Sequence, residues 1–389
     1  MPTMTPYRLS ITASSDPYPT YRRMRDEDPV HYSEPEDVWV LTRYKDVSAA
    51  FKDWRTWSSQ RRGNLLNDIP ERIGKTLGTS DPPSHRFARS LVEKAFTPRS
   101  VEAMQPSVRS MAEVMSAEAR ERGTIEFVQD ISAPFNAGVL GAMFGIPNSD
   151  FLLLRHWLDD FFQRENAPVG SVSRQVLAMR ALNDYLGGLA DERNARPGPD
   201  LMSAMLRAEE CGRRLNREQV VVTTMTFLTA GFESTNNLFT NLAYALALHR
   251  ETYQLLSQEI SMVHGAIEES MRWDAAAQGF VRCPTREVLL HDKTIPEGSQ
   301  VLLHIGSANR DEREFEDPDR FDLGRETRRH LGMGQGIHFC VGAPLGRMMA
   351  QTLFSMLLPV SRHWEIDLAD AHRVTTPNFR GFSALPLTV

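Results

Sequence analysis

The chain has 389 residues, 41% of them hydrophobic and 24% charged, and its formal net charge is −6 at pH 7. This balance is ordinary for a soluble globular protein and argues against nucleic acid as the main partner, and three scattered cysteines exclude a disulfide framework and a four-ligand zinc site. Because no apolar run reaches the ~18 residues that span a membrane and the N-terminus lacks the features of a signal peptide, we expect a soluble, cytoplasmic, monomeric protein that does not contact a membrane.

The first predicted elements are a hairpin and a run of helices. Apolar and polar residues alternate from Val30 to Val47 around a turn, which predicts a short hairpin. Helical periodicity dominates from Pro83 to Arg193, and within it Asp150 to Phe162 and Ser171 to Arg193 are expected to form two amphipathic helices. The segment between them, QRENAPVG, is expected to act as a hinge, with plain packing of the two helices as the equally weighted alternative.

A longer helix is predicted next. It starts at a capping-box-like pair, Asn216 and Gln219, and its pattern runs to about His249. At 1.5 Å per residue it would be roughly 50 Å long, enough to cross the molecule as a buried internal helix.

The remaining elements are shorter. We expect a helix ending near Trp273, short strands between Gly279 and Leu303, and an irregular stretch from Asn309 to Gly336. A last helix begins just after Cys340, and the C-terminal FRGFSALPLTV is typical of strand and turn. The chain does not alternate strand and helix as a doubly wound fold does. The predicted fold class is therefore mainly α with small peripheral β-sheets, in one domain spanning 1–389.

The stretch MGQGIHFCVG, from Met333 to Gly342, sets one cysteine among three glycines directly before a helix. The glycines, Gly334 and Gly336 among them, allow several N–H groups to converge on one point, and the N-terminus of the helix adds its positive end. Both effects favour a thiolate, so we expect Cys340 to have a lowered pKa and to bind a metal or cofactor. A structural cysteine, a redox sensor and a nucleophile are the alternatives.

The longer stretch GMGQGIHFCVGAPLGR, from Gly332 to Arg347, resembles the haem-binding loop of the cytochrome P-450 superfamily. The resemblance implies that Cys340 is the thiolate ligand of the iron of haem b, with Gly334 and Gly342 in the cofactor-binding loop, and that His338 contacts a haem propionate. Met333 stands where the family has an aromatic residue, a difference that concerns the reduction potential and not the ligation. The resemblance covers nearly the whole chain and implies a haem held between the long central helix and the cysteine loop.

The same resemblance assigns three basic residues to the haem propionates. His85 and Arg89 in DPPSHRFAR match the family's His-x-x-x-Arg pair, and Arg282 in GFVRCPTREV matches a further propionate-binding arginine. A dianionic cofactor in a dry pocket needs fixed cations. Each of these residues taken alone would more often be a solvated surface charge.

A structural pair also matches the family. Glu269 and Arg272 in EESMR lie 71 residues before the cysteine, counted from Glu269 to Cys340. The resemblance implies that Arg320, in DPDRF, completes the pair and braces the segment leading to the cysteine loop. An isolated Glu-x-x-Arg is usually an exposed ion pair.

The motif AGFESTN lies in the long helix and contains Ala230, Gly231, Glu233 and Ser234. It resembles the family motif above the iron, which implies a groove for dioxygen beside the two small residues and a proton relay through the acid and the alcohol. The alcohol here is serine, which keeps the hydroxyl but lacks the methyl group that restricts threonine rotamers, so we expect poorer coupling or some use of peroxide. A purely structural interpretation is that the glycine eases helix packing and the serine bonds back to the backbone.

The implied activity is mono-oxygenation, because thiolate ligation favours O–O cleavage. One atom of O2 would hydroxylate, epoxidise or O-demethylate an apolar or aromatic small molecule. Since only 49 residues follow Cys340, we expect a separate ferredoxin and its reductase to supply electrons, docking near Arg328, Arg329 and Arg347. The alternatives are a natural-product tailoring oxidase that performs a less usual oxidation or uses peroxide, and a non-catalytic haem-thiolate binding protein.

The resemblance also maps substrate contacts to residues 61–75, 161–172, 227–234 and 277–281. Aromatic and aliphatic side chains there predict an apolar pocket for an aromatic or polycyclic molecule. The candidate pocket residues are Phe227, Ala277, Phe280, Val281 and Phe382. Arg61 or Arg62 could pair with a substrate carboxylate, although solvent exposure is an equally good interpretation of both.

Overall fold

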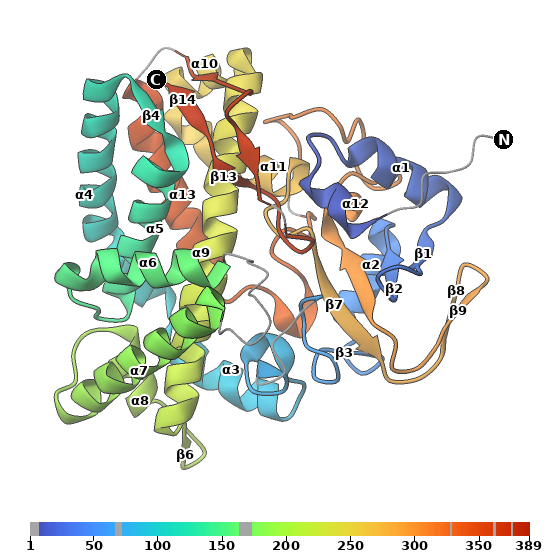
Figure 1. Cartoon of the computed structure of the whole chain (residues 1–389), viewed down its shortest axis with the longest axis horizontal. Coiled ribbons are helices and arrows are strands. Elements are labelled where there is room, and N and C mark those ends of the chain that lie inside the picture. The colour runs from blue at the N-terminus through green and yellow to red at the C-terminus, as the bar shows by residue number, and fades with distance from the viewer. Residues whose placement is uncertain (1–7, 67–71, 163–172, 327–328, 361–362, 375) are drawn as a thin grey trace.

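The structure is a computed structural model that describes residues 8–66, 72–162, 173–326, 329–360, 363–374 and 376–389. Helices gather around one long central helix, and the largest of the sheets lies to one side of them (Figure 1). The predicted fold class, mainly α with small peripheral sheets, is confirmed.

The central element is α9, Arg217–Leu248, a helix of 32 residues. It begins with the predicted capping box: the Gln219 N–H donates to Asn216 Oδ1 over 2.8 Å, and the Asn216 N–H donates to Gln219 Oε1 over 2.9 Å. The helices that pack against it are α5 (Ala133–Met143), α6 (Phe151–Phe162), α7 (Arg174–Ala195), α8 (Leu201–Arg207), α10 (Arg250–Gln258), α11 (Val263–Trp273) and α13 (Ala343–Leu357). Their apolar faces bury the middle of α9, as expected of an internal helix.

The remaining helices lie outside this group or at its edges. They are α1 (Tyr18–Glu27), α2 (Tyr44–Lys52), α3 (Ser84–Ala95), α4 (Pro98–Arg122) and α12 (Ile305–Ala308). The long α4 packs against α13 and α5 on the side away from the largest sheet (Figure 1).

The largest sheet has the strand order β1-β2-β10-β7-β3. Its strands are β1 (Val30–Ser33), β2 (Val38–Leu41), β10 (Val301–His304), β7 (Gly279–Pro284) and β3 (Trp57–Ser58). Strands β1 and β2 form the predicted hairpin, with Val30 opposite Leu41. The prediction extended it too far, because residues 44–47 form the first turn of α2.

Four smaller sheets complete the described β-structure. They contain β4 (Thr124–Glu126) with β14 (Pro386–Thr388) and β11 (Glu365–Ile366), β12 (His372–Arg373) with β13 (Phe382–Ala384), β5 (Glu209–Glu210) with β6 (Arg213–Arg214), and β8 (Val288–Leu290) with β9 (Lys293–Ile295). The strands expected before residue 303 and near the C-terminus are therefore confirmed.

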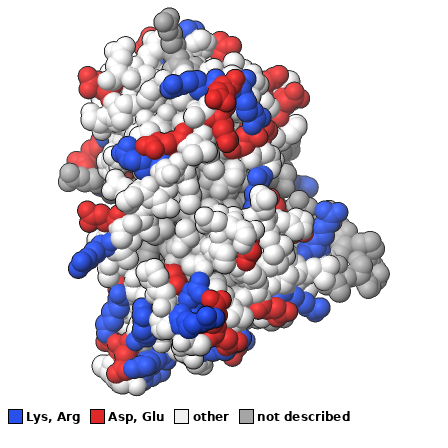
Figure 2. Space-filling view, turned by 90° about the vertical axis from the view of Figure 1, so that its left-hand side faces the viewer, with Lys and Arg blue, Asp and Glu red and all other residues white. Residues whose placement is uncertain are grey.

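The predicted pair of amphipathic helices is present as α6 and α7. The segment QRENAPVG between them lies outside the described residues, so its expected hinge role stays a prediction. In the part of the chain that the structure describes, no helix is both long and apolar enough to cross a bilayer. The face carrying α4 and α6 shows basic and acidic side chains interspersed (Figure 2), in keeping with the mild net charge.

Two buried apolar clusters meet at the cysteine loop. One surrounds α9, and the other lies between the large sheet and α2. Met333 packs against the first and Leu331 belongs to the second. The segment leading to Cys340 thus joins the two parts of the molecule.

Candidate functional site

The cysteine loop has the glycine-dependent backbone that its sequence predicts. Gly334 and Gly336 have φ angles of 68° and 69°, which residues with a Cβ rarely adopt. A Cβ on Gly336 would also collide with the carbonyl oxygen of Phe51 in α2. The Cys340 N–H donates to the carbonyl oxygen of Met333 over 3.0 Å, which closes the loop just before α13.

The expected lowering of the Cys340 pKa is wrong. Burial raises the pKa of the thiol, and the N–H groups of Gly342 and Ala343 and the charge of Arg89 oppose this effect without outweighing it. The Cys340 thiol is nevertheless exposed. A neutral thiol that loses its proton when a cation binds suits a metal ligand better than a free nucleophile.

Basic side chains from three separate segments gather beside this loop. The ring centroids of His85 and His338 are 4.5 Å apart, and His338 Nε2 lies 3.2 Å from Ser59 Oγ. Arg282, buried on β7, lies close enough to lower the pKa of both histidines. The structure therefore brings these predicted site residues together.

Burial dominates the electrostatics of this basic cluster. Burial and the neighbouring cations lower the pKa of His338 to about 2, and burial lowers the pKa of Arg282 to about 10. Among the described residues, Asp81 acts to raise the pKa of both Arg282 and His85, and Glu93 acts in the same direction on His85. The Asp81 carboxylate already accepts hydrogen bonds from Ser58 and Ser59. A dianionic cofactor would add negative charge beside these buried basic groups. The cluster and the nearby cysteine sulfur thus fit a haem.

Arg89 lies at the edge of the same cluster. It donates to the carbonyl oxygen of Phe339 over 2.8 Å, and its Nε pairs with Glu93 Oε1 over 2.6 Å. The bond to Phe339 ties α3 to the residue before Cys340, while Glu93 lies in α3 itself. Arg89 is thus placed both to steady the loop and to contribute positive charge beside it.

Glu269 and Arg272 form a fully buried, two-pronged ion pair. Arg272 Nη2 and Nε lie 2.8 Å from the two carboxylate oxygens of Glu269. The arginine also donates to the carbonyl oxygens of Asn309 and Pro318, at 3.0 and 2.8 Å. The pair therefore braces the irregular segment that leads to the cysteine loop, as the resemblance implied.

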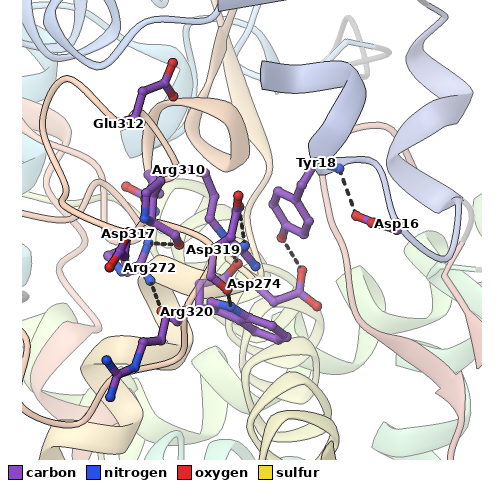
Figure 3. A network of polar contacts seen from close by, with 12 residues as sticks. Asp16, Tyr18, Arg272, Asp274, Arg310, Glu312, Asp317, Asp319 and Arg320 are labelled. Carbon is purple, nitrogen blue, oxygen red and sulfur yellow. Dashed lines mark hydrogen bonds and ion pairs between the residues drawn. The ribbon is translucent and has the colours of Figure 1, made fainter. Parts of the chain in front are cut away.

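The third member of this brace is Arg325, and the assignment of Arg320 is wrong. Arg320 offers only its carbonyl oxygen to Arg272 Nη2, over 3.0 Å, and its exposed side chain is turned away from the pair (Figure 3). Arg325 Nε instead lies 3.2 Å from Glu269 Oε1. The arginine of FDLGR, five residues further on, was the signal that the sequence analysis missed.

A second missed cluster lies around Glu268. Arg347 donates to both oxygens of this carboxylate, over 2.5 and 2.9 Å, and His330 Nε2 lies 3.1 Å from Oε2. Burial would raise the pKa of Glu268, but these bonds outweigh it and lower the pKa to about 2. Arg347 is thus paired with Glu268, and its expected part in docking a ferredoxin stays a prediction.

Arg328 and Arg329 are the other two arginines expected near a docked ferredoxin. Arg329 is well exposed but pairs with Glu314 over 2.8 Å. Arg328 lies outside the described residues. The described part of this predicted surface therefore carries paired charge.

The turn of α9 that carries AGFESTN separates its residues onto two sides. Ala230 and Ser234, four residues apart, lie on one face, and the Ser234 hydroxyl donates to the carbonyl oxygen of Ala230 over 2.6 Å. A Cβ on Gly231 would lie 3.2 Å from Leu140 of α5, so this glycine permits helix packing. The buried carboxylate of Glu233 accepts from Asn237 Nδ2 over 3.1 Å.

A cavity of about 470 Å³ lies between α7, α9 and residues 72–76. Its apolar lining consists of Phe161, Met179, Val222 and Met225. Charged side chains also line it: Arg72, Lys75, Arg180, Asp184 and Glu218. Residues 61–75, 161–172 and 227–234, three of the expected substrate segments, each contribute to this lining.

None of the five predicted pocket residues lines this cavity. Phe227 packs against Phe96 and Phe144, at centroid distances of 6.2 and 6.1 Å, and the ring of Phe382 lies 3.8 Å from the Arg373 guanidinium carbon. The others belong to the sheet region, where Ala277 is bridged to Phe379, Phe280 packs near the same ring and Val281 is buried beside Tyr21 and Met24.

Comparison with known proteins adds three findings. The family model described as cytochrome P-450 matches residues 28–382. The chain is 34% identical to a putative cytochrome P-450 123 of Mycobacterium tuberculosis over 96% of its own length and 94% of that protein, and 35% identical to the cyclomarin C epoxidase CymV of Salinispora arenicola over 84% of each. The crystal structure of CYP109E1 from Bacillus megaterium in complex with corticosterone superimposes with a TM-score of 0.88 at 28% identity, covering 98% of this chain and 99% of that one.

Proposed function

Because the chain belongs to the cytochrome P-450 family and is therefore a haem-containing oxidoreductase, we propose that it inserts one atom of dioxygen into a mainly apolar small molecule held between α7 and α9. The observation that carries this proposal is the convergence of His85, His338 and Arg282 beside the loop that carries Cys340. A haem with a thiolate ligand supplies the activation of dioxygen. The role of the protein is to hold the haem, to orient the substrate and to shield the site from water.

We assign Cys340 to the iron and the basic cluster to the propionates. His85, His338 and Arg282 come from α3, the cysteine loop and β7, so the bound cofactor would tie three elements together. Arg89 joins them from the edge of the cluster, where it already holds the Phe339 carbonyl. Charge-assisted bonds to buried carboxylates are strong because little water competes for them.

Glu233 and Ser234 are the proposed proton carriers. The Ser234 hydroxyl now donates to the Ala230 carbonyl, so it must rotate away from that bond to pass a proton outward. Serine rotates more freely than threonine because it has no γ-methyl group. The carboxylate of Glu233 is held by Asn237 and is placed one residue from this hydroxyl along α9.

The substrate is proposed to occupy the cavity beside Phe161, Val222 and Met225. A volume of about 470 Å³ lies within the range of sites for drug-sized molecules. Two relatives support a polycyclic or natural-product substrate, since one is named as an epoxidase of cyclomarin C and another was solved with corticosterone. We further propose that a separate ferredoxin provides the two electrons.

The test begins with the reduced carbon monoxide complex of the purified protein. Thiolate ligation predicts a far-shifted Soret band that is lost in Cys340→Ala and kept in Cys211→Ala, a change at an exposed turn. A Cys340→Ala protein that keeps the band would refute the ligation. Product formation with dioxygen and a reduced ferredoxin, for a molecule that shifts the haem spin state, then separates a monooxygenase from a non-catalytic binding protein.

A further inference from the structure

Three successive carbonyl groups of α9 each accept a hydrogen bond from a side chain. The Ala230 carbonyl accepts from Ser234 Oγ over 2.6 Å. The carbonyls of Gly231 and Phe232 accept from Asn136 Nδ2, over 3.3 and 2.8 Å. A side-chain donor at a helix carbonyl competes with the backbone N–H and locally changes the geometry of the helix. The turn affected is the one that precedes Glu233 and Ser234.

Asn136 reaches α9 from the middle of α5 and is completely buried. Its Nδ2 also lies 3.2 Å from Asn236 Oδ1, which accepts from Ser132 Oγ over 2.9 Å. Backbone carbonyls can only accept, so the amide nitrogen must face α9. The orientation of the Asn136 amide is therefore set by its partners.

The arrangement of Asn136 does not maximise the stability of the fold. Asn136 Oδ1 is buried and has no hydrogen-bond partner among the described residues. An unpaired buried acceptor is unfavourable, and an apolar side chain of the same shape would avoid it. The neighbouring positions on this side of α5 are apolar, with Leu140 facing Gly231. An amide at position 136 thus has a use other than packing.

We propose that Asn136 is a positioning residue for the oxygen-handling turn of α9. Its amide ties the Gly231 and Phe232 carbonyls to α5 and so fixes where the backbone presents Glu233 and Ser234. The inference rests on the proposed function for the roles of these two side chains. It concerns a contact between α5 and α9 that the haem-binding motifs do not include.

The test compares Asn136→Leu with Ser132→Ala. The leucine keeps the shape of the side chain and removes the bonds to both α9 carbonyls and the bond to Asn236 Oδ1. Ser132→Ala removes only the other bond to Asn236 Oδ1 and leaves both carbonyl bonds in place. The first readout is amide hydrogen exchange over residues 229–236, which needs no turnover. We expect several-fold faster exchange in Asn136→Leu and near wild-type exchange in Ser132→Ala, with little change in thermal stability for either.

The second readout is peroxide released per electron consumed, which we expect to rise several-fold in Asn136→Leu alone. If Asn136→Leu does not fold, Asn136→Asp replaces it; the neutral buried acid keeps one O–H donor, so the same changes are expected at smaller size. Wild-type exchange and coupling in the folded variant would overturn the proposal, as would equal effects of Ser132→Ala. If the wild-type protein shows no thiolate-type Soret band, the proposed function is refuted. The exchange result would still test whether Asn136 holds this turn of α9.

Discussion

Replacing Arg325 is the sharpest test of how the segment before the cysteine loop is held. Arg325→Ala removes an Nε bond to the buried Glu269 and an Nη2 bond to the Asp317 carbonyl, at 3.2 and 2.9 Å, and also a bond to the Glu316 carbonyl. The arginine side chain is only 11% exposed, so water replaces these bonds poorly. Hydrogen bonds to charged groups contribute about 1.5–3 kcal/mol, and we expect the free energy of unfolding to fall by that amount.

Arg320→Ala is the matched control, five residues away in the same segment. Its side chain is exposed and its contribution to the brace is a backbone carbonyl, which alanine retains. The expected change is within about 0.5 kcal/mol. Urea unfolding followed by circular dichroism and by haem absorbance measures both variants. Equal losses of stability, or a larger loss for Arg320→Ala, would show that the brace is wrongly assigned.

Three further predictions concern the site itself. Ser234→Ala should raise the peroxide released per electron consumed, measured against product formed, and unchanged coupling would remove this hydroxyl from the proton path. Arg282→Gln should speed the loss of haem to a haem-accepting protein roughly ten-fold, since a buried charge-assisted bond is lost; wild-type retention would contradict its role as a propionate partner. Burial would raise the pKa of Glu268, but its bonds to Arg347 and His330 lower the pKa to about 2, below the ~4.3 of an unfolded carboxyl. The stabilisation that the Glu268 carboxylate gives the fold is therefore complete above about pH 5 and is lost as the pH falls toward 2. The difference in unfolding free energy between wild type and Glu268→Gln should therefore shrink across that range in acid titrations, and a constant difference would refute the assignment.

Local patterns in the sequence were sufficient to predict much of the fold. The capping box at Asn216, the hairpin after Val30 and the glycine loop before Cys340 are each made by residues close together in the chain. Such features depend on turn chemistry and hydrophobic period, which survive in almost any tertiary context. The family resemblance then located His85 and Arg282, and the structure placed both beside the cysteine loop.

Other features depended on which side of an element faces the interior. Arg320 and Arg325 lie in one irregular segment, and only the folded path of that segment turns one guanidinium toward Glu269 and the other toward solvent. Val281 and Arg282 are neighbours on β7 and so point to opposite faces of the sheet. The five candidate substrate residues do not line the cavity beside α7 and α9, and their role in substrate binding stays a prediction.

The sequence by itself determined the fold class, the main helices and the residue types able to hold a haem, because these follow from short-range pattern and motif spacing. The tertiary structure alone decided the direction of the pKa shift of Cys340, the pairing of Arg347 with Glu268 and the contact of Asn136 with α9. Each of these joins residues distant in the chain or depends on how much protein surrounds a group. Desolvation and long-range pairing are properties of the packed molecule, and no local stretch of sequence contains them.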